Sequence, residues 1–215
     1  MPRKKRPLDR DSGVVRDARL IVIASEDKYA VESYFRRFRT RRVQFVVLPT
    51  EDCKSSPVHV MKRLDGYFKD NATEEGDEFW VCIDSDHWVK ANHVANLVQV
   101  LQQCGQKGYC FAISNPCIEL WLLLHFADVE IPVTGRLSMA EAEMQLRSAA
   151  GGYKKAKCDR LEITGEQVVR AIERAKTLDV TDEELPRSPF TRVYQIVESL
   201  LEKDAIDLSK PGDGH

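Results

Sequence analysis

The chain has 215 residues, enough for one domain with a sizeable core or for one domain with a helical extension. Hydrophobic residues make up 43% of the sequence and charged residues 31%, the composition of an ordinary soluble globular protein. No apolar run reaches the roughly 18 residues that a membrane span needs, and no apolar segment follows the basic N-terminus as it would in a secretory signal. The formal net charge of −2 neither requires nor excludes a nucleic-acid partner.

The six cysteines contain no CxxC pair, and two of them lie inside apolar, strand-like runs. A secreted disulfide-bonded protein would be shorter and richer in cysteine. We therefore predict reduced thiols and a cytoplasmic location. The cysteine spacing gives no support for a zinc site.

The first 137 residues are predicted to form a basic arm and an α/β core. Residues 1–17 are polar and charged, and the arm that they form is expected to be flexible. Apolar spacing then predicts alternating elements in chain order: strand 20–24, helix 30–38, strand 43–48, helix 58–68, strand 78–83, helix 94–101, strand 109–113 and helix 118–126. This alternation is typical of an open, mostly parallel sheet with helices on both faces, which we assign to residues 18–137.

The rest of the sequence shows no clear strand. Apolar spacing predicts helices over residues 139–149, 165–178 and 189–202. We therefore expect residues 138–207 to form a helical C-terminal extension packed on the core.

Acidic residues follow two of the predicted strands. Glu26 lies just past the first strand, and Asp84 and Asp86 lie just past the third. Open α/β sheets bind ligands at the carboxyl ends of their strands, and residues i and i+2 of a strand point the same way. Carboxylates that converge there repel one another unless a cation neutralises them, and they suit Mg²⁺. The alternative is that Asp84 and Asp86 cap the next helix.

Basic residues and histidines supply further candidates. Arg36 and Arg37 belong to a run in which arginines and aromatic residues alternate; the run is either the polar end of a helix or a phosphate-contacting edge. Lys154 and Lys155 either reach a phosphate or form a basic pair at a helix end. Two histidines near the acidic pair are either surface residues or aids to metal binding and proton transfer, namely His87 and His93.

The segment from Ser114 to Phe126, SNPCIELWLLLHF, resembles the signature of the RloB-like family, which also includes the AbiL abortive-infection component. Other stretches resemble the family as well: the strand ending in Glu26, the strand ending in Asp84-Ser85-Asp86, the segment 152–155, and residues 188–197. We expect Trp121, Leu122 and Leu124 to lie in the core. Glu119 and His125 are expected to lie on different faces of the helix without a direct hydrogen bond.

The resemblance implies a TOPRIM-like fold in which Glu26, Asp84 and Asp86 hold Mg²⁺ or Mn²⁺. It also implies phage defence together with a partner ATPase of the ABC or AAA type. The chain departs from the family pattern at the first motif, where Asp27 replaces a glycine and where Ala30 and Val31 replace a Thr-Glu pair.

Two functions are compatible with this sequence. One is a metal-dependent nuclease that cuts RNA, such as tRNA, or DNA; in it Lys154, Lys155, Arg36 and Arg37 would contact phosphate. The other is a non-catalytic sensor or regulatory module bound to the ATPase, which the altered first motif favours. The sequence leaves the oligomeric state open, including a homo-oligomer.

Overall fold

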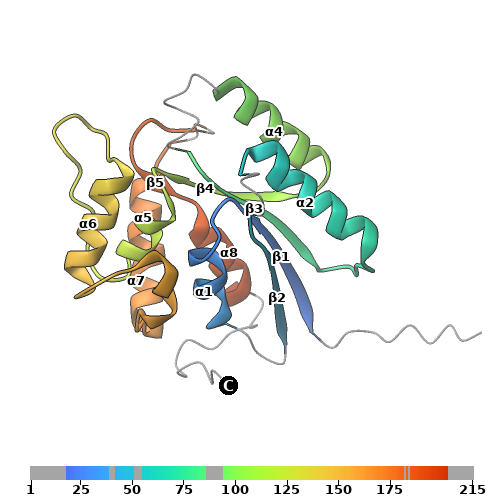
Figure 1. The fold of residues 1–215 in the computed structure, drawn as a ribbon, viewed down its shortest axis with the longest axis horizontal. Helices are drawn as coiled ribbons and strands as arrows, with labels where there is room; N and C mark the ends of the chain where they lie inside the picture. The colour runs from blue at the N-terminus through green and yellow to red at the C-terminus, as the bar shows by residue number, and fades with distance from the viewer. Residues whose placement is uncertain are drawn as a thin grey trace, which may run out of the picture.

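The computed structural model describes residues 18–38, 42–50, 55–85, 94–181, 183 and 185–202. Its centre is a five-stranded sheet with the order β2-β1-β3-β4-β5 (Figure 1). The strands are β1 (Arg19–Ser25), β2 (Val43–Leu48), β3 (Glu78–Asp84), β4 (Cys110–Asn115) and β5 (Phe190–Thr191). The pairs among β1 to β4 are parallel, whereas β5 pairs with β4 in the antiparallel direction.

Helices cover both faces of the sheet (Figure 1). One face carries α2 (Pro57–Asp70) and α4 (Val94–Gln106). The other carries α1 (Ala30–Arg36), α5 (Ile118–Leu123) and α8 (Val193–Glu202). Three further helical segments complete that second side: α6 (Met139–Ala149), the 3-10 helix η1 (Lys155–Arg160) and α7 (Gly165–Leu178). The predicted α/β class, with a mostly parallel sheet and helices on both faces, is confirmed.

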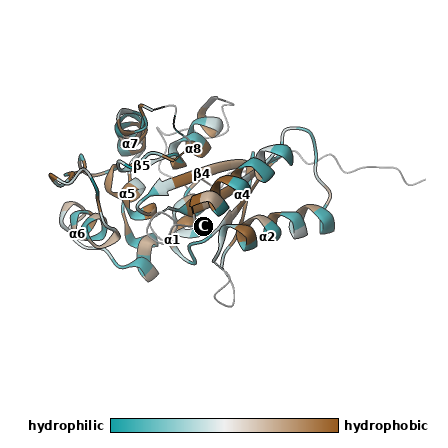
Figure 2. Cartoon of the chain, turned by 90° about the horizontal axis from the view of Figure 1, so that it is seen from above, coloured by the Kyte–Doolittle hydropathy of each residue, from teal (hydrophilic) through white to brown (hydrophobic). Residues whose placement is uncertain are grey.

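Alternating side chains of the central strands supply the two cores. In β1, Leu20 and Val22 face the α2 and α4 side, whereas Ile21 and Ile23 face the opposite side. A strand turns successive side chains to opposite faces, so a fully apolar strand needs cover on both. In Figure 2, β4 is largely brown, so it is hydrophobic, whereas α2 and α4 carry both hydrophobic and hydrophilic residues.

The chain after residue 138 departs from the predicted helical extension at one place. Helices α6 and α7 occupy the predicted ranges, but Phe190–Thr191 forms β5 and α8 begins only at Val193. Ser114 pairs with Thr191 in this ladder, and their hydroxyl oxygens lie 2.8 Å apart. The prediction of a helix that begins at residue 189 was therefore wrong. A strand of two residues is too short to show the alternation of apolar and polar side chains from which a strand is predicted.

The apolar segment after β4, residues 118–126, contributes to the core on the side of the sheet that α1, α5 and α8 cover. Trp121, Leu122 and Leu124 are buried, as predicted. His125 is buried too, with Nε2 3.1 Å from the Tyr34 hydroxyl and Nδ1 2.9 Å from the Trp121 carbonyl oxygen. No Glu119–His125 hydrogen bond occurs between these described residues, as expected. No helix in the described ranges is long and apolar enough to cross a membrane.

Candidate active site

Strands β1 and β3 end side by side and bring two of the predicted acids together. Ser25 pairs with Cys82, and the Glu26 amide donates to the Cys82 carbonyl oxygen at 3.1 Å. Asp84 is the last residue of β3 and lies beside Ser114 of β4. The Glu26 and Asp84 carboxylates consequently interact electrostatically. Asp86, His87 and His93 lie outside the described residues, so their places in the site stay predictions.

Polar contacts from β2 and α2 fix the backbone that follows β1. The Thr50 hydroxyl donates to the Glu26 carbonyl oxygen at 2.7 Å, and Arg63 Nη2 donates to the Ser25 carbonyl oxygen at 2.6 Å. These bonds satisfy carbonyl groups that have left the strand ladder. They hold Glu26 at the carboxyl edge of the sheet, where ligands bind in α/β proteins.

Asp27, at the family's glycine position, has a structural contact of its own. Its Oδ1 accepts hydrogen bonds from the backbone amides of Tyr29, at 2.7 Å, and of Ala30. Its own amide donates to Ser25 Oγ at 2.9 Å. Asp27 is only 7% exposed, so it adds a buried carboxylate to the edge while tying down the start of α1.

Glu119 brings a further carboxylate to the same place from the first turn of α5. The residue is 3% exposed, and its Oε1 accepts a hydrogen bond from the Tyr153 hydroxyl at 3.1 Å. Its Oε2 is buried and has no hydrogen-bond partner among the described residues. An oxygen of this kind is costly to bury, so a cation that paired with it would stabilise the site.

Lys155 connects the carboxylate of Asp27, which precedes α1, with the carboxylate of Glu119 in α5. Its Nζ lies 2.9 Å from Asp27 Oδ2 and 3.2 Å from Glu119 Oε1. Burial by itself would lower the pKa of Lys155, but Glu119 and Asp27 outweigh it and raise the pKa, so the ammonium group stays charged. The side chain is still 39% exposed, which leaves it open to solvent and to an incoming ligand.

Neighbouring carboxylates disfavour the ionised form of Asp84. Burial, then Glu26 and Glu119, raise the pKa of Asp84 well above its ordinary value, although Lys155 acts in the opposite direction. Burial raises the pKa of the Cys82 thiol, helped by Asp84, and raises the pKa of the Cys117 thiol, helped by Glu119, so both cysteines stay protonated. A carboxylate surrounded by others gains from a cation.

The donor atoms fit a hard divalent cation. Carboxylate oxygens from Glu26, Asp84 and Glu119 are the ligand type that Mg²⁺ and Mn²⁺ prefer, and the free Glu119 Oε2 is one such donor. Among the described residues, however, no three His, Cys, Asp or Glu side chains gather closely enough to hold an ion. A complete site therefore needs Asp86, a shift of the carboxylates, or both.

The four basic residues predicted to contact phosphate have different surroundings. Arg36 pairs with Glu32 at 2.9 Å on the surface of α1. Arg37 donates to the Tyr34 carbonyl oxygen at 2.8 Å, and its guanidinium carbon lies 4.9 Å from the Tyr34 ring centroid. Lys154 is exposed, whereas Lys155 belongs to the acidic cluster. The positions of these four side chains do not test phosphate binding, so their contact with phosphate stays a prediction.

Sequence reasoning missed the roles of Asp27, Glu119 and Tyr153 in the site. Glu119 carried a signal, because it is an acid within a long apolar run and the structure buries it. Tyr153 precedes the lysine pair but touches Glu119 across 34 residues of sequence. Such a contact follows from how α5 and the 152–155 segment pack, which local patterns do not specify.

A family model described as RloB-like protein matches residues 21–200. This range contains most of β1 and all of β2 to β5, and with them Glu26, Asp84, Glu119 and Lys155. No curated protein and no solved structure matches the chain.

Proposed function

The chain belongs to the RloB-like protein family, and from that premise we propose that it is a phage-defence effector that cleaves nucleic-acid phosphodiester bonds with Mg²⁺ or Mn²⁺. The family relates the chain to phage defence and abortive infection. The reaction, the substrate class and the metal are our proposals. RNA, such as tRNA, and DNA are both candidate substrates.

The observation that carries this proposal is the surplus of carboxylate at the carboxyl edge of the sheet. Among the described residues, Asp27 and Glu119 both pair with the Lys155 ammonium group, Glu26 and Glu119 lie in electrostatic range of Asp84, and Glu119 Oε2 is buried without a hydrogen-bond partner. A purely structural cluster would be expected to balance its charges and satisfy its oxygens. The buried Glu119 oxygen has no hydrogen-bond partner among the described residues, which favours a site that is completed by a ligand.

Each side chain has a proposed role. Glu26 and Asp84, together with Asp86, would hold the metal, and Glu119 Oε2 could serve as a further ligand. The metal would polarise the phosphodiester and stabilise the charge that develops as the bond breaks. Glu26 would also orient the attacking water. Lys155 would hold Asp27 and Glu119 in place and meet the negative phosphate group.

The proposed partner is an ATPase of the ABC or AAA type that controls the nuclease. This partner follows from the family resemblance, and no surface of the protein is assigned to it. Control by a partner would suit a chain in which Lys155 occupies two of the described carboxylates and in which no three described side chains form a metal site.

The test is cleavage by the purified protein, alone and with the ATPase that accompanies it, of labelled total RNA and of plasmid DNA in Mg²⁺ or Mn²⁺. We expect discrete cuts that disappear in EDTA and in the Asp84→Asn variant. An Asp84→Asn protein that cuts as fast as the wild type would contradict the proposal.

A non-catalytic sensor or regulatory module is the second candidate. The ion pairs of Asp27 and Glu119 with Lys155 favour it, because a lysine can replace a lost metal as the counter-ion of an acidic cluster. This alternative predicts no cleavage under any condition and intact defence in the Asp84→Asn variant.

A further inference from the structure

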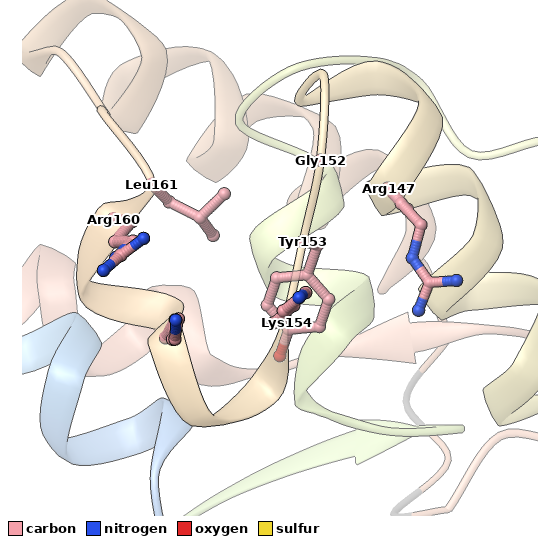
Figure 3. A pocket seen from close by; sticks show the side chains of 7 residues that line it. Arg147, Gly152, Tyr153, Lys154, Arg160 and Leu161 are labelled. Atoms are coloured by element: carbon pink, nitrogen blue, oxygen red, sulfur yellow. The ribbon is translucent and has the colours of Figure 1, made fainter.

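Beside the acidic cluster, the surface has a hollow of about 550 Å³ whose rim is basic. Four cationic side chains line it, from the end of α6, the 152–154 turn and η1: Arg147, Lys154, Lys157 and Arg160. Figure 3 shows Arg147 on one side and Arg160 on the other, with Tyr153 and Lys154 between them. The segment 147–161 contains five basic residues and one acid, Asp159. We call this feature the basic hollow.

The cations of the basic hollow are mostly available to a ligand. Lys154, Lys157 and Arg160 are exposed and form no ion pair with any other described residue. Arg147 pairs with Glu143 at 2.6 Å on the surface, where its side chain is 60% exposed. Exposed pairs of this type contribute little to stability, so an anionic ligand can compete for Arg147.

The backbone conformation joins the basic hollow to the acidic cluster. Lys154 is extended, with φ −138° and ψ 123°, so the side chains before and after it point the opposite way. Tyr153 and Lys155 accordingly reach Glu119, while Lys154 extends to the other side of the segment; both Tyr153 and Lys154 line the hollow. Gly152, with φ 143°, permits the turn that delivers this segment. The hollow and the acidic cluster thus share Tyr153, which lines the hollow and also donates a hydrogen bond to Glu119.

We propose that the basic hollow binds the phosphate backbone of the nucleic-acid strand and presents it to the acidic cluster, an inference that rests on the proposed nuclease function. Flexible lysine and arginine side chains around an open hollow suit a chain of phosphates. Tyr153 is 5% exposed, which leaves its ring no face on which a base could stack. Binding in the hollow is therefore expected to depend on the backbone rather than on base sequence.

The test uses the full chain with Asp84→Asn in EDTA, so that no cleavage occurs, and measures binding to fluorescein-labelled 20-nucleotide RNA and DNA strands by anisotropy. The Lys157→Ala/Arg160→Ala pair removes two cations from the hollow. The matched control, Lys62→Ala/Lys69→Ala, removes two exposed cations from α2 on the other face of the sheet.

We expect the hollow variant to bind roughly 10- to 30-fold more weakly at 0.1 M salt and to lose about 1.4 from the slope of log K against log salt, since each contact with single strands contributes about 0.7. Equal affinities of the hollow variant and the control would overturn the inference, and so would a parent protein that binds neither strand. The proposed function has a separate test, because metal-dependent cleavage that survives the hollow substitutions would refute only the basic hollow.

Discussion

The two faces of the sheet are built from the same strands but bury different kinds of side chain. The face under α2 and α4 is filled with aliphatic and aromatic residues, and an ion pair beside it, Lys107 with Asp65, lies near the surface. The face under α1 and α5 encloses Tyr34, Glu119 and His125, and Asp27 is buried at its carboxyl edge.

This difference separates scaffold from site. An apolar core is stabilised by burial and by packing. Buried charges lower stability unless they are paired, so a protein that retains them has a use for them or compensates for them. The α2 and α4 face accordingly supports the fold, and the carboxyl edge of the other face is where we propose the binding site. Substitutions at matched positions can break or sharpen this comparison.

The largest effect is expected from Asp84→Asn. Loss of a metal ligand should reduce nuclease activity by about 1,000-fold or more, which corresponds to about 4 kcal/mol of transition-state stabilisation. The same substitution should raise the stability of the protein. The raised pKa of Asp84 means that the fold loses stability as pH rises through that pKa, so the neutral amide should raise Tm in EDTA at pH 7.5. Cleavage rates and thermal unfolding of the same preparation check both signs.

Equal truncations on the two faces should have equal effects. Leu64 on α2 and Leu122 on α5 are both 0% exposed. Replacing either with alanine should lower the free energy of unfolding by about 2–5 kcal/mol through lost burial and a residual cavity. Urea unfolding measures the loss. If only the Leu122→Ala variant were destabilised, the α2 face would not be the support described above.

The scaffold could be predicted from sequence more fully than the site. Apolar periodicity predicts strand β2 and helices α6 and α7 with the same first and last residues that the structure shows. Glu26 and Asp84 follow from the rule that ligands bind at the carboxyl ends of strands. Both inferences need only local pattern and chain order.

The remaining features depend on contacts between distant segments. Asp27, Glu119 and Lys155 meet although they come from three separate elements. The lysine pair also shows what sequence leaves out, because the extended backbone at Lys154 sends neighbouring lysines to different surroundings. Adjacent residues of one type therefore acquire different roles through backbone geometry alone.

A smaller effect is expected from Lys155→Met, which removes the cation and keeps the length of the side chain. Asp27 and Glu119 would lose their shared partner. The cost should be about 1–2 kcal/mol, below the 3–5 kcal/mol typical of fully buried pairs, because Lys155 is 39% exposed. Thermal unfolding in EDTA measures this loss, with exposed Lys154→Met as the matched control. A variant as stable as the control would show that Lys155 does not neutralise the cluster.

The smallest effect concerns His125 and pH. Burial lowers the pKa of His125 from 6.5 to about 3, so the unfolded chain takes up a proton before the folded protein does. Stability is therefore complete above about pH 6.5 and falls as pH drops toward 3. Between pH 7 and pH 6 the loss should be under about 1 kcal/mol. His125→Asn should flatten this part of the curve of Tm against pH. An unchanged curve would show that His125 does not cause this pH dependence.

Metal binding tests the central claim most directly. The measurement is the Tm of the wild type and of Asp84→Asn, with each protein titrated with Mg²⁺ and Mn²⁺ from EDTA. A site at the carboxyl edge predicts a saturable rise in the wild type, equivalent to about 2.7 kcal/mol at 100 times Kd, and little or no rise in the variant. A wild type whose Tm does not change with either metal, or an Asp84→Asn protein with the same rise as the wild type, would contradict the account.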